Sequence, residues 1–191
     1  GYGYGGWHQI DGIHYHYCPF DFHSNFVEEV NNMCRSFVHH FFATENITGR
    51  FNIVHAHDWL ASNAAVWTKE GRGTKMILTI HSTEYGRCGN HLYDGISNWI
   101  RDHEYNGTSC ADRVITVSNY IRDEICWLYK VPPWKITVVH NGIHALQNIR
   151  LPDLKEIRSK LDIGPMDPMV LFVGRLSIQK GPDILINAIP M

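Results

Sequence analysis

A glycine and two cations stand close together near the carboxyl end of the chain, in the run VLFVGRLSIQKG from Val170 to Gly181. An apolar segment leads into Gly174, Arg175 follows at once, and Lys180 precedes a predicted helix. Guanidinium and ammonium groups bind phosphate oxygens, glycine lets the backbone approach, and a helix amino end favours an anion. The spacing therefore predicts a site for a phosphorylated ligand after a strand. The alternative interpretation is that Arg175 and Lys180 are solvated surface charges, and the neighbouring strand, glycine and helix favour the binding site over it.

Three other predicted strands run into polar segments: HAHDW at His55–Trp59, HSTEYGR at His81–Arg87 and HNG at His140–Gly142. The carboxyl ends of parallel strands meet at one edge of a sheet, where ligands bind. Each segment also has a structural interpretation. We expect His55 to end a buried strand, Asp58 can cap the next helix, and Asn-Gly is a tight turn. The second segment opens a loop too long for a simple connection, which favours function there.

The elements that must position these side chains alternate along the chain. The apolar runs predict strands and the 3.6-residue periodicity predicts helices. We expect strands at 51–56, 75–80, 113–117 and 136–139, and helices from Ser24, at 59–70, at 96–105 and from Ser118 to about 129. Because the strands are continuous apolar runs, they predict an α/β fold with a Rossmann-like parallel sheet covered by helices on both faces.

We expect three parts: a Rossmann-like domain at 1–145, a linker with one charged helix at 146–168, and the first strand and helix of a second Rossmann-like domain at 169–191. Residues 1–23 are rich in glycine, aromatic residues and histidine and give no assignment. The chain begins without Met and ends inside a predicted helix, so we expect a fragment of an enzyme.

Composition narrows the function classes. The chain has 191 residues, 44% of them hydrophobic and 19% charged, which is ordinary for a globular protein. A net charge of -2 gives no reason to expect nucleic acid. No apolar stretch approaches the roughly 20 residues that span a bilayer, so we expect no transmembrane segment. Five cysteines without CxxC spacing indicate neither a disulfide framework nor a zinc site, and favour the cytoplasm.

Several segments occur in the order known from one enzyme group: FNIVHAHDWLASNAA, TKMILTIHSTEYGR, ADRVITVSNYIRDEI, KITVVHNGI and VLFVGRLSIQKG. In this order and spacing the chain resembles the retaining glycosyltransferases with two Rossmann-like domains (GT-B type), the group that contains glycogen and starch synthases. The resemblance covers roughly residues 50 to 191. The family pattern usually has proline before the Asn-Gly, where this chain has His140. The family's amino-terminal glycine loop is not visible.

The resemblance implies a nucleotide sugar bound between the two domains, with Arg175 and Lys180 on its diphosphate and His81 facing its sugar ring. The two cations would stabilise the charge that develops on the leaving phosphate, so no metal and no cofactor is expected. The implied roles are catalytic for His81, Arg175 and Lys180, donor-binding for Gly174, Arg175, Lys180 and Asn141, and acceptor-side for His57, Asp58, Glu84 and Arg87.

The resemblance thus implies a hexosyltransferase that moves a hexose from a UDP-, ADP- or GDP-sugar to a hydroxyl of a glycan or small-sugar acceptor. The glutamates that would hold the donor sugar are expected downstream of Met191. The chain would then carry half an active site, would be inactive alone, and would need the remainder of its second domain as a partner. The sequence does not assign the donor base, the sugar, the acceptor or the oligomeric state.

Two other classes stay open. Histidines at successive strand ends (His55, His57, His81 and His140) resemble the ligands of amidohydrolase barrels, in which a divalent ion activates water. Against this class, no carboxylate completes the set, and 151–168 reads as a linker where a barrel needs unbroken alternation. A non-catalytic domain that binds a nucleotide sugar or a glycan is the other class, and downstream glutamates would distinguish it from an enzyme.

Overall fold

The computed structural model describes residues 6–143 and 153–189. The chain divides into two compact units, Gly1–Asn141 and Gly142–Met191, each of which is described by itself. The last two residues of the predicted first domain, 144–145, and the first part of the predicted linker, 146–152, lie outside the described residues. No helix within the described ranges combines the length and the apolarity needed to cross a membrane.

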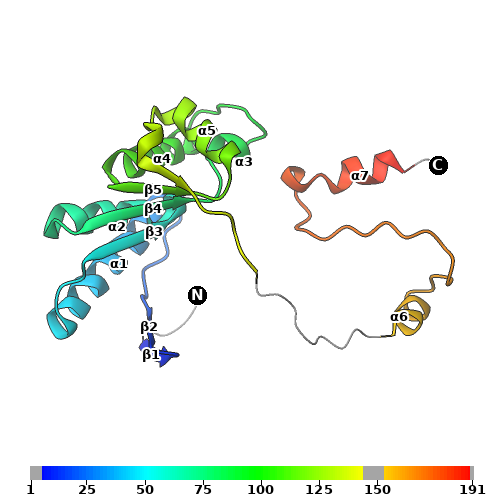
Figure 1. The fold of residues 1–191 in the computed structure, drawn as a ribbon, viewed down its shortest axis with the longest axis horizontal. Helices are drawn as coiled ribbons and strands as arrows, with labels where there is room; N and C mark the ends of the chain where they lie inside the picture. The colour runs from blue at the N-terminus through cyan, green and yellow to red at the C-terminus, as the bar shows by residue number, and fades with distance from the viewer. Residues whose placement is uncertain (1–5, 144–152, 190–191) are drawn as a thin grey trace. The chain divides into compact units, whose positions relative to one another are not determined.

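The first unit is built on a four-stranded parallel sheet (Figure 1). Its strands are β3 (Ile53–His57), β4 (Lys75–Ile80), β5 (Arg113–Thr116) and β6 (Ile136–Val138). They pair in sequence order, β3-β4-β5-β6, which requires a crossover helix between successive strands. The α/β fold is therefore confirmed. The predicted strand at 75–80 has the bounds of β4. Strands β5 and β6 each end one residue earlier than predicted, and β3 starts two residues later and ends one residue later than predicted.

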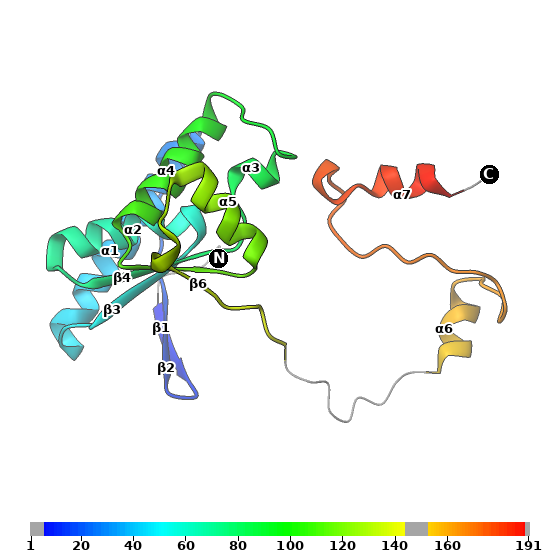
Figure 2. The ribbon, with the colours of Figure 1, turned by 45° about the horizontal axis from the view of Figure 1, so that its top comes forward.

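The helices of this unit are α1 (Phe26–Thr48), α2 (Asp58–Arg72), α3 (Glu84–Arg87), α4 (Ile96–Cys110) and α5 (Asn119–Tyr129), with a 3-10 turn, η1 (Pro133–Lys135), before β6. Figure 2 shows α2, α4 and α5 on one side of the sheet. The core beneath them joins Met76, Leu78 and Val114 of the strands to Val66 and Ile125 of the helices.

Among the described residues, helices pack on one face of the sheet and not on both as predicted. The strand side chains of the other face are mostly exposed or half-buried, with Thr79 buried among them. On that second face Ile53 and His55 are exposed, and Ile77 and Ile115 are half-buried. The apolar residues at these alternate positions made each strand look buried on both sides, although only one side packs against helices.

Helices α1 and α5 begin where a side chain accepts a hydrogen bond from a backbone N–H group of the first turn, and α2 ends at a glycine. Asn25, rather than the predicted Ser24, caps α1, because its Oδ1 accepts the N–H of Val27 at 2.9 Å. Ser118 caps α5 as predicted, accepting the N–H of Ile121 at 3.2 Å. Helix α2 continues past Gly71 to Arg72 and ends at Gly73, which adopts a left-handed φ of 69°.

Helix α4 extends five residues beyond its predicted end near 105, and Gly107 explains why. A Cβ at this position would lie 2.8 Å from the Cβ of Ser62 and 3.0 Å from Cδ2 of Leu78. The glycine therefore lets α4 pack closely against α2 and β4 instead of ending the helix. Next to this contact, Val30 and Cys34 of α1 pack with Trp59, Ala64 and Ile100 in a second apolar cluster.

Residues that received no sequence assignment form a β-hairpin of β1 (Gly6–Ile10) and β2 (Ile13–Tyr17). Asp11 and Gly12 connect the strands with φ values of 51° and 80°. Such left-handed pairs make the tight turns that suit antiparallel hairpins, and Asp-Gly is a sequence signal for them. The hairpin forms its own two-stranded sheet, separate from β3–β6.

The second unit contains α6 (Leu154–Lys160), the 3-10 turn η2 (Ile178–Lys180) and α7 (Pro182–Ala188). The charged helix predicted in the linker is present as α6, and Asp153 caps it by accepting the N–H of Lys155 at 2.9 Å. The predicted strand that leads into Gly174 is not formed among the described residues, since no neighbouring strand pairs with it. The helix predicted after Gly181 is present as α7.

Candidate active site at the strand ends

The carboxyl ends of β3 and β4 bring two predicted site residues together. His57 pairs in register with Thr79, and His81 follows one residue after β4 ends. The Nδ1 atom of His57 lies 3.0 Å from Nε2 of His81, within hydrogen-bond distance. Their rings are stacked, with centroids 5.3 Å apart and planes inclined by 20°. An imidazole hydrogen bond of this kind needs one donor and one acceptor nitrogen.

Asp58 joins the same two strand ends through the backbone. Its Oδ1 accepts the backbone N–H of His81 at 2.8 Å. The interpretation of Asp58 as the cap of the next helix is wrong, because the N-cap position belongs to His57 and Asp58 is the first residue of α2. Asp58 has a φ of 56°, in the left-handed region that residues other than glycine rarely adopt. Such strain is found where a backbone positions a functional group.

His55 has a different environment on the same strand. Its Nε2 lies 2.7 Å from Oγ1 of Thr79, and its ring stacks on His57 with centroids 4.6 Å apart. Desolvation lowers the pKa of His55, and positive charge on His57 lowers it further. His55 is exposed rather than buried as predicted, but its bond to Thr79 agrees with the structural role preferred for it.

The loop after β4 is held by a buried ion-pair network around Arg87. Its Nη2 lies 2.7 Å from Oε1 of Glu104, its Nε donates to Glu84 at 3.1 Å, and its Nη1 donates to the carbonyl of Ser82 at 3.0 Å. Burial lowers the pKa of Arg87, but the carboxylates of Glu104 and Glu84 outweigh it and the net shift is upward. Arg87 and Glu84 therefore hold the loop, and their acceptor-side role stays a prediction.

Glu104 lies at the centre of this network and was not predicted as a site residue. Its side chain is fully buried, and its oxygens accept the backbone N–H of Glu84 at 2.9 and 3.1 Å. The hydroxyl of Tyr129 donates to the other side of the same carboxylate. Desolvation raises the pKa of Glu104 despite these donors. In the sequence, the one indication of its burial is that Glu104 lies four residues after Ile100 and so on the same apolar face of the helix.

A second buried contact holds the middle of the loop. The hydroxyl of Thr83 donates to Glu124 and accepts the N–H of Gly86 at 3.0 Å. Thr83 thereby caps α3, and Glu124 ties that cap to α5. The loop between His81 and Arg87 is thus anchored to two helices, α4 and α5, which makes its first residue a fixed point.

His140 and Asn141 follow β6, two strands away from β4. Nδ1 of His140 lies 3.1 Å from the carbonyl of Val117, so this ring ties the ends of β5 and β6. His140 therefore does not join His57 and His81. Among the described residues, no three His, Cys, Asp or Glu side chains are grouped to hold a metal ion. The strands also form an open sheet and not a barrel, so the amidohydrolase alternative is not supported.

The predicted donor residues lie in the second unit. A Cβ on Gly174 would be 3.8 Å from Cγ of Lys180, which places the lysine stem beside this glycine. The turn forms because the N–H of Ser177 donates to the carbonyl of Arg175 and the N–H of Lys180 donates to that of Ser177, both at 2.9 Å. Arg175 and Lys180 are exposed, and Gly181 enters α7 with a φ of 61°.

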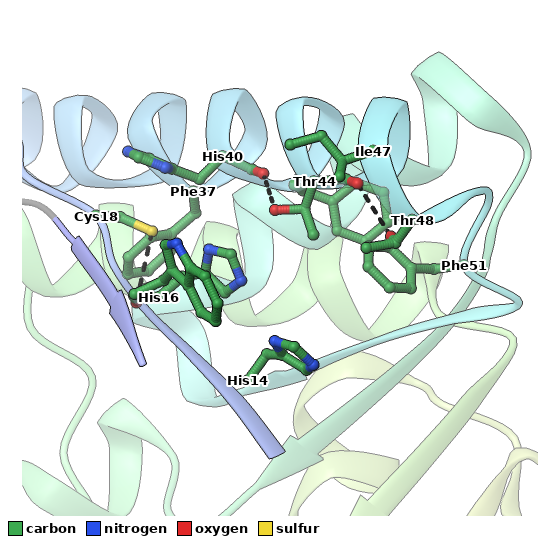
Figure 3. Close-up of a pocket in the computed structure, with 11 residues that line it drawn as sticks. His14, His16, Cys18, Phe37, His40, Thr44, Ile47, Thr48 and Phe51 are labelled. Atoms are coloured by element: carbon green, nitrogen blue, oxygen red, sulfur yellow. Dashed lines mark hydrogen bonds between the residues drawn. The ribbon is translucent and has the colours of Figure 1, made fainter. Parts of the chain in front are cut away.

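A cavity of about 880 Å³ lies elsewhere in the first unit, between the hairpin and α1. Figure 3 shows Phe37, His40 and Thr44 along α1, opposite His14 and His16 of the hairpin. Its lining is mainly aromatic and aliphatic, and it contains none of the predicted site residues. The predicted residues His57, Asp58 and His81 therefore lie at the strand ends and not in this cavity.

Comparison with known proteins agrees with this geometry. Residues 9–145 match the family described as Glycosyltransferase Family 4. The chain is 38% identical over 144 residues to a glycosyltransferase of Methanocaldococcus jannaschii, covering 74% of this chain and 37% of that protein. It is 34% identical over 141 residues to the glycogen synthase of Mycobacterium tuberculosis, covering 74% of this chain and 32% of that protein.

A solved structure shares the fold: sucrose-phosphate synthase from Thermosynechococcus elongatus superimposes with a TM-score of 0.65 at 20% identity, over 84% of this chain and 39% of that one. The chain spans about a third of the length of the curated relatives it matches. The family match covers well over half of the chain and includes the His57–His81 pair and the loop network. This chain therefore belongs to Glycosyltransferase Family 4.

Proposed function

We propose that the protein is a retaining hexosyltransferase that moves a hexose from a nucleoside-diphosphate sugar to an acceptor hydroxyl. The observation that carries this proposal is the hydrogen-bonded His57–His81 pair at the carboxyl ends of β3 and β4, in a chain of Glycosyltransferase Family 4. Ligands of open α/β sheets bind at that edge. A fixed imidazole there can bind a sugar hydroxyl, which is the role proposed for His81.

Breaking the bond between the sugar and the diphosphate builds negative charge on the leaving phosphate. Arg175 and Lys180 are exposed, and the turn through Ser177 holds the lysine stem beside Gly174. We assign them to the donor diphosphate, where two fixed cations stabilise the developing charge in the transition state. Gly174 and Asn141 complete the proposed donor side, and no cofactor enters the reaction.

The acceptor side is assigned to His57, Asp58, Glu84 and Arg87, of which Glu84 and Arg87 act by shaping the loop. Named relatives act on different acceptors: one is a glycogen synthase, and another, from Catenulispora acidiphila and 31% identical over 145 residues, is a D-inositol 3-phosphate glycosyltransferase. We therefore propose a hydroxyl-rich acceptor, a glycan or a small sugar. Five free thiols support a cytoplasmic location.

The test is nucleotide release by the full-length protein from UDP-, ADP- and GDP-hexoses, with Arg175→Ala as the variant. We expect release from one donor and a loss of about 10²–10³-fold in kcat for the variant, because a donor to the transition-state charge is removed. Arg50→Ala, which removes an exposed arginine of the first unit, is the matched control and should retain activity. Binding of a donor without release would indicate the non-catalytic class instead.

A further inference from the structure

We propose that His57 is a positioning residue for His81: it fixes the ring orientation and the tautomer of His81, so that Nδ1 of His81 faces the ligand. The proposal rests on the proposed function, which gives His81 its contact with the donor sugar. It adds to the acceptor-side role proposed for His57, because His57 then also acts through another side chain.

The first support is the use of nitrogens in the pair. Nε2 of His81 faces Nδ1 of His57 at 3.0 Å, so only Nδ1 of His81 remains available for a sugar hydroxyl. In a neutral imidazole one nitrogen donates and the other accepts. The bond couples the two tautomers: when His57 donates, Nε2 of His81 accepts and Nδ1 of His81 carries the proton, and when His81 donates the reverse holds.

The second support is that His81 is held at two points. Asp58 accepts its backbone N–H at 2.8 Å, and His57, the residue before Asp58, holds its ring. The two neighbours thus fix both the main chain and the side chain of His81. Without the ring contact, the imidazole of His81 could rotate about its side-chain bonds and exchange tautomers. A side chain held in one orientation contributes more to the reaction rate than one that rotates freely.

The third support is that His57 is itself constrained from behind. Its ring stacks on His55 at 4.6 Å, and His55 is bonded to Thr79 in the sheet. Desolvation and, to a smaller extent, His57 lower the pKa of His55. The stack therefore ties His57 to the sheet while leaving its Nδ1 for His81.

The test separates ring stacking from hydrogen bonding at position 57. His57→Phe keeps an aromatic ring without Nδ1, and His57→Asn keeps a polar atom near the Nδ1 position without the ring. His39→Phe is the matched control, since it replaces an exposed imidazole of α1 outside the site and leaves the His57–His81 bond. Each variant is made in the full-length protein, with ¹⁵N-labelled histidine for NMR.

In the wild type, the His57→Asn and the His39→Phe proteins, we expect ¹⁵N shifts of His81 that report one dominant tautomer. In His57→Phe we expect averaged shifts from two tautomers, together with a fall in kcat of about 10–100-fold and a smaller change in the donor KM. Recovery of most of this loss in His57→Asn would identify the hydrogen bond as the cause, because a purely structural ring would not be replaced by an amide.

A single His81 tautomer that persists in His57→Phe would overturn the proposal. So would an averaged tautomer with unchanged kcat in an active wild-type enzyme. If the wild type releases no nucleotide from any donor while the NMR shifts respond as expected, the proposed function fails and the pairing of the two imidazoles stands. The spectroscopic and kinetic results therefore separate the two claims.

Discussion

The carboxylate of Asp58 accepts the backbone N–H of His81 at 2.8 Å and so links the first residue of α2 to the residue that follows β4. The two residues lie 23 positions apart in the chain. Asp58 makes this bond from a left-handed conformation, with a φ of 56°. The bond fixes the start of the loop that carries the candidate site. Asp58 therefore contributes both to the stability of the fold and to the position of His81.

Asp58→Ala should therefore cost about 1–3 kcal/mol of unfolding free energy, because it removes the acceptor and leaves an alanine in the strained conformation. Asp58→Asn retains an acceptor oxygen and tolerates the left-handed region, so its cost should be below about 1 kcal/mol. Urea denaturation of the two variants measures the difference. Equal stability of the alanine variant and the wild type would show that the bond contributes nothing.

The site was only partly predictable from the sequence. The polar residues at the strand ends follow a recognisable pattern, and the buried residues that support the loop do not. His57, Asp58 and His81 are polar residues directly after apolar runs, and the end of a parallel strand is a recognised ligand position. Glu104 left no such trace, since a glutamate in a helix is ordinarily solvated. Its burial depends on Arg87 and Tyr129, from two other elements, and only the tertiary structure brings these together.

The fold divides in the same way. Strand β4 was predicted to the residue because Lys75 and His81 bound its apolar run. The open face of the sheet was missed, because Ile77 and Ile115 are apolar whether or not a helix covers them. The predicted helix at 96–105 ended too early, and the close contact of Gly107 with Ser62 in its last turns is one that no local pattern encodes.

Glu104→Ala should be among the most destabilising substitutions in the first unit, at about 3–5 kcal/mol, because it leaves the guanidinium of Arg87 without its buried partner. Asp123→Ala, which breaks an exposed pair with Arg122, is the control and should change stability by less than about 1 kcal/mol. Chemical denaturation of both variants measures the two losses of unfolding free energy. Similar small effects for the two would mean that water or a relaxed loop replaces the Glu104 carboxylate.

Asp112 should make stability fall in acid. Its carboxylate accepts a hydrogen bond from Lys69 and one from the backbone N–H of Met76, each at 2.8 Å, which holds its pKa at about 2, below the usual 3.8. A depressed folded-state pKa stabilises the protein above the unfolded-state value, and this stabilisation is lost as the pH falls through about 4 toward 2.

The measurement is the difference in Tm between the wild type and Asp112→Asn as a function of pH. The wild type should be more stable at pH 6, and the difference should shrink steadily below pH 4. A difference that stays constant from pH 6 to pH 2 would show that the charge of Asp112 is not responsible.

Gly107→Ala should destabilise the first unit by about 1–3 kcal/mol through overpacking, although alanine is the better helix former. The added Cβ would meet Ser62 at 2.8 Å and Leu78 at 3.0 Å. Gly71→Ala in α2 is the matched comparison. Its Cβ would meet only the ring of Phe42, at 3.2 Å, and a ring end can move. In thermal unfolding, the Tm of Gly71→Ala should therefore be higher than that of Gly107→Ala. The reverse order would contradict the close-packing role of Gly107.

Chelation gives the last prediction, and it separates the two reaction classes. In the proposed transferase the charge on the leaving diphosphate is stabilised by Arg175 and Lys180, so nucleotide release by the full-length protein should be unchanged by EDTA. Arg175→Ala should remain impaired whether or not Mg²⁺ is added, because a free cation does not reproduce the paired N–H donors of a guanidinium. A metal-activated water would behave in the opposite way. Loss of activity with EDTA and its return with Zn²⁺ would require the strand-end histidines to be reassigned as ligands.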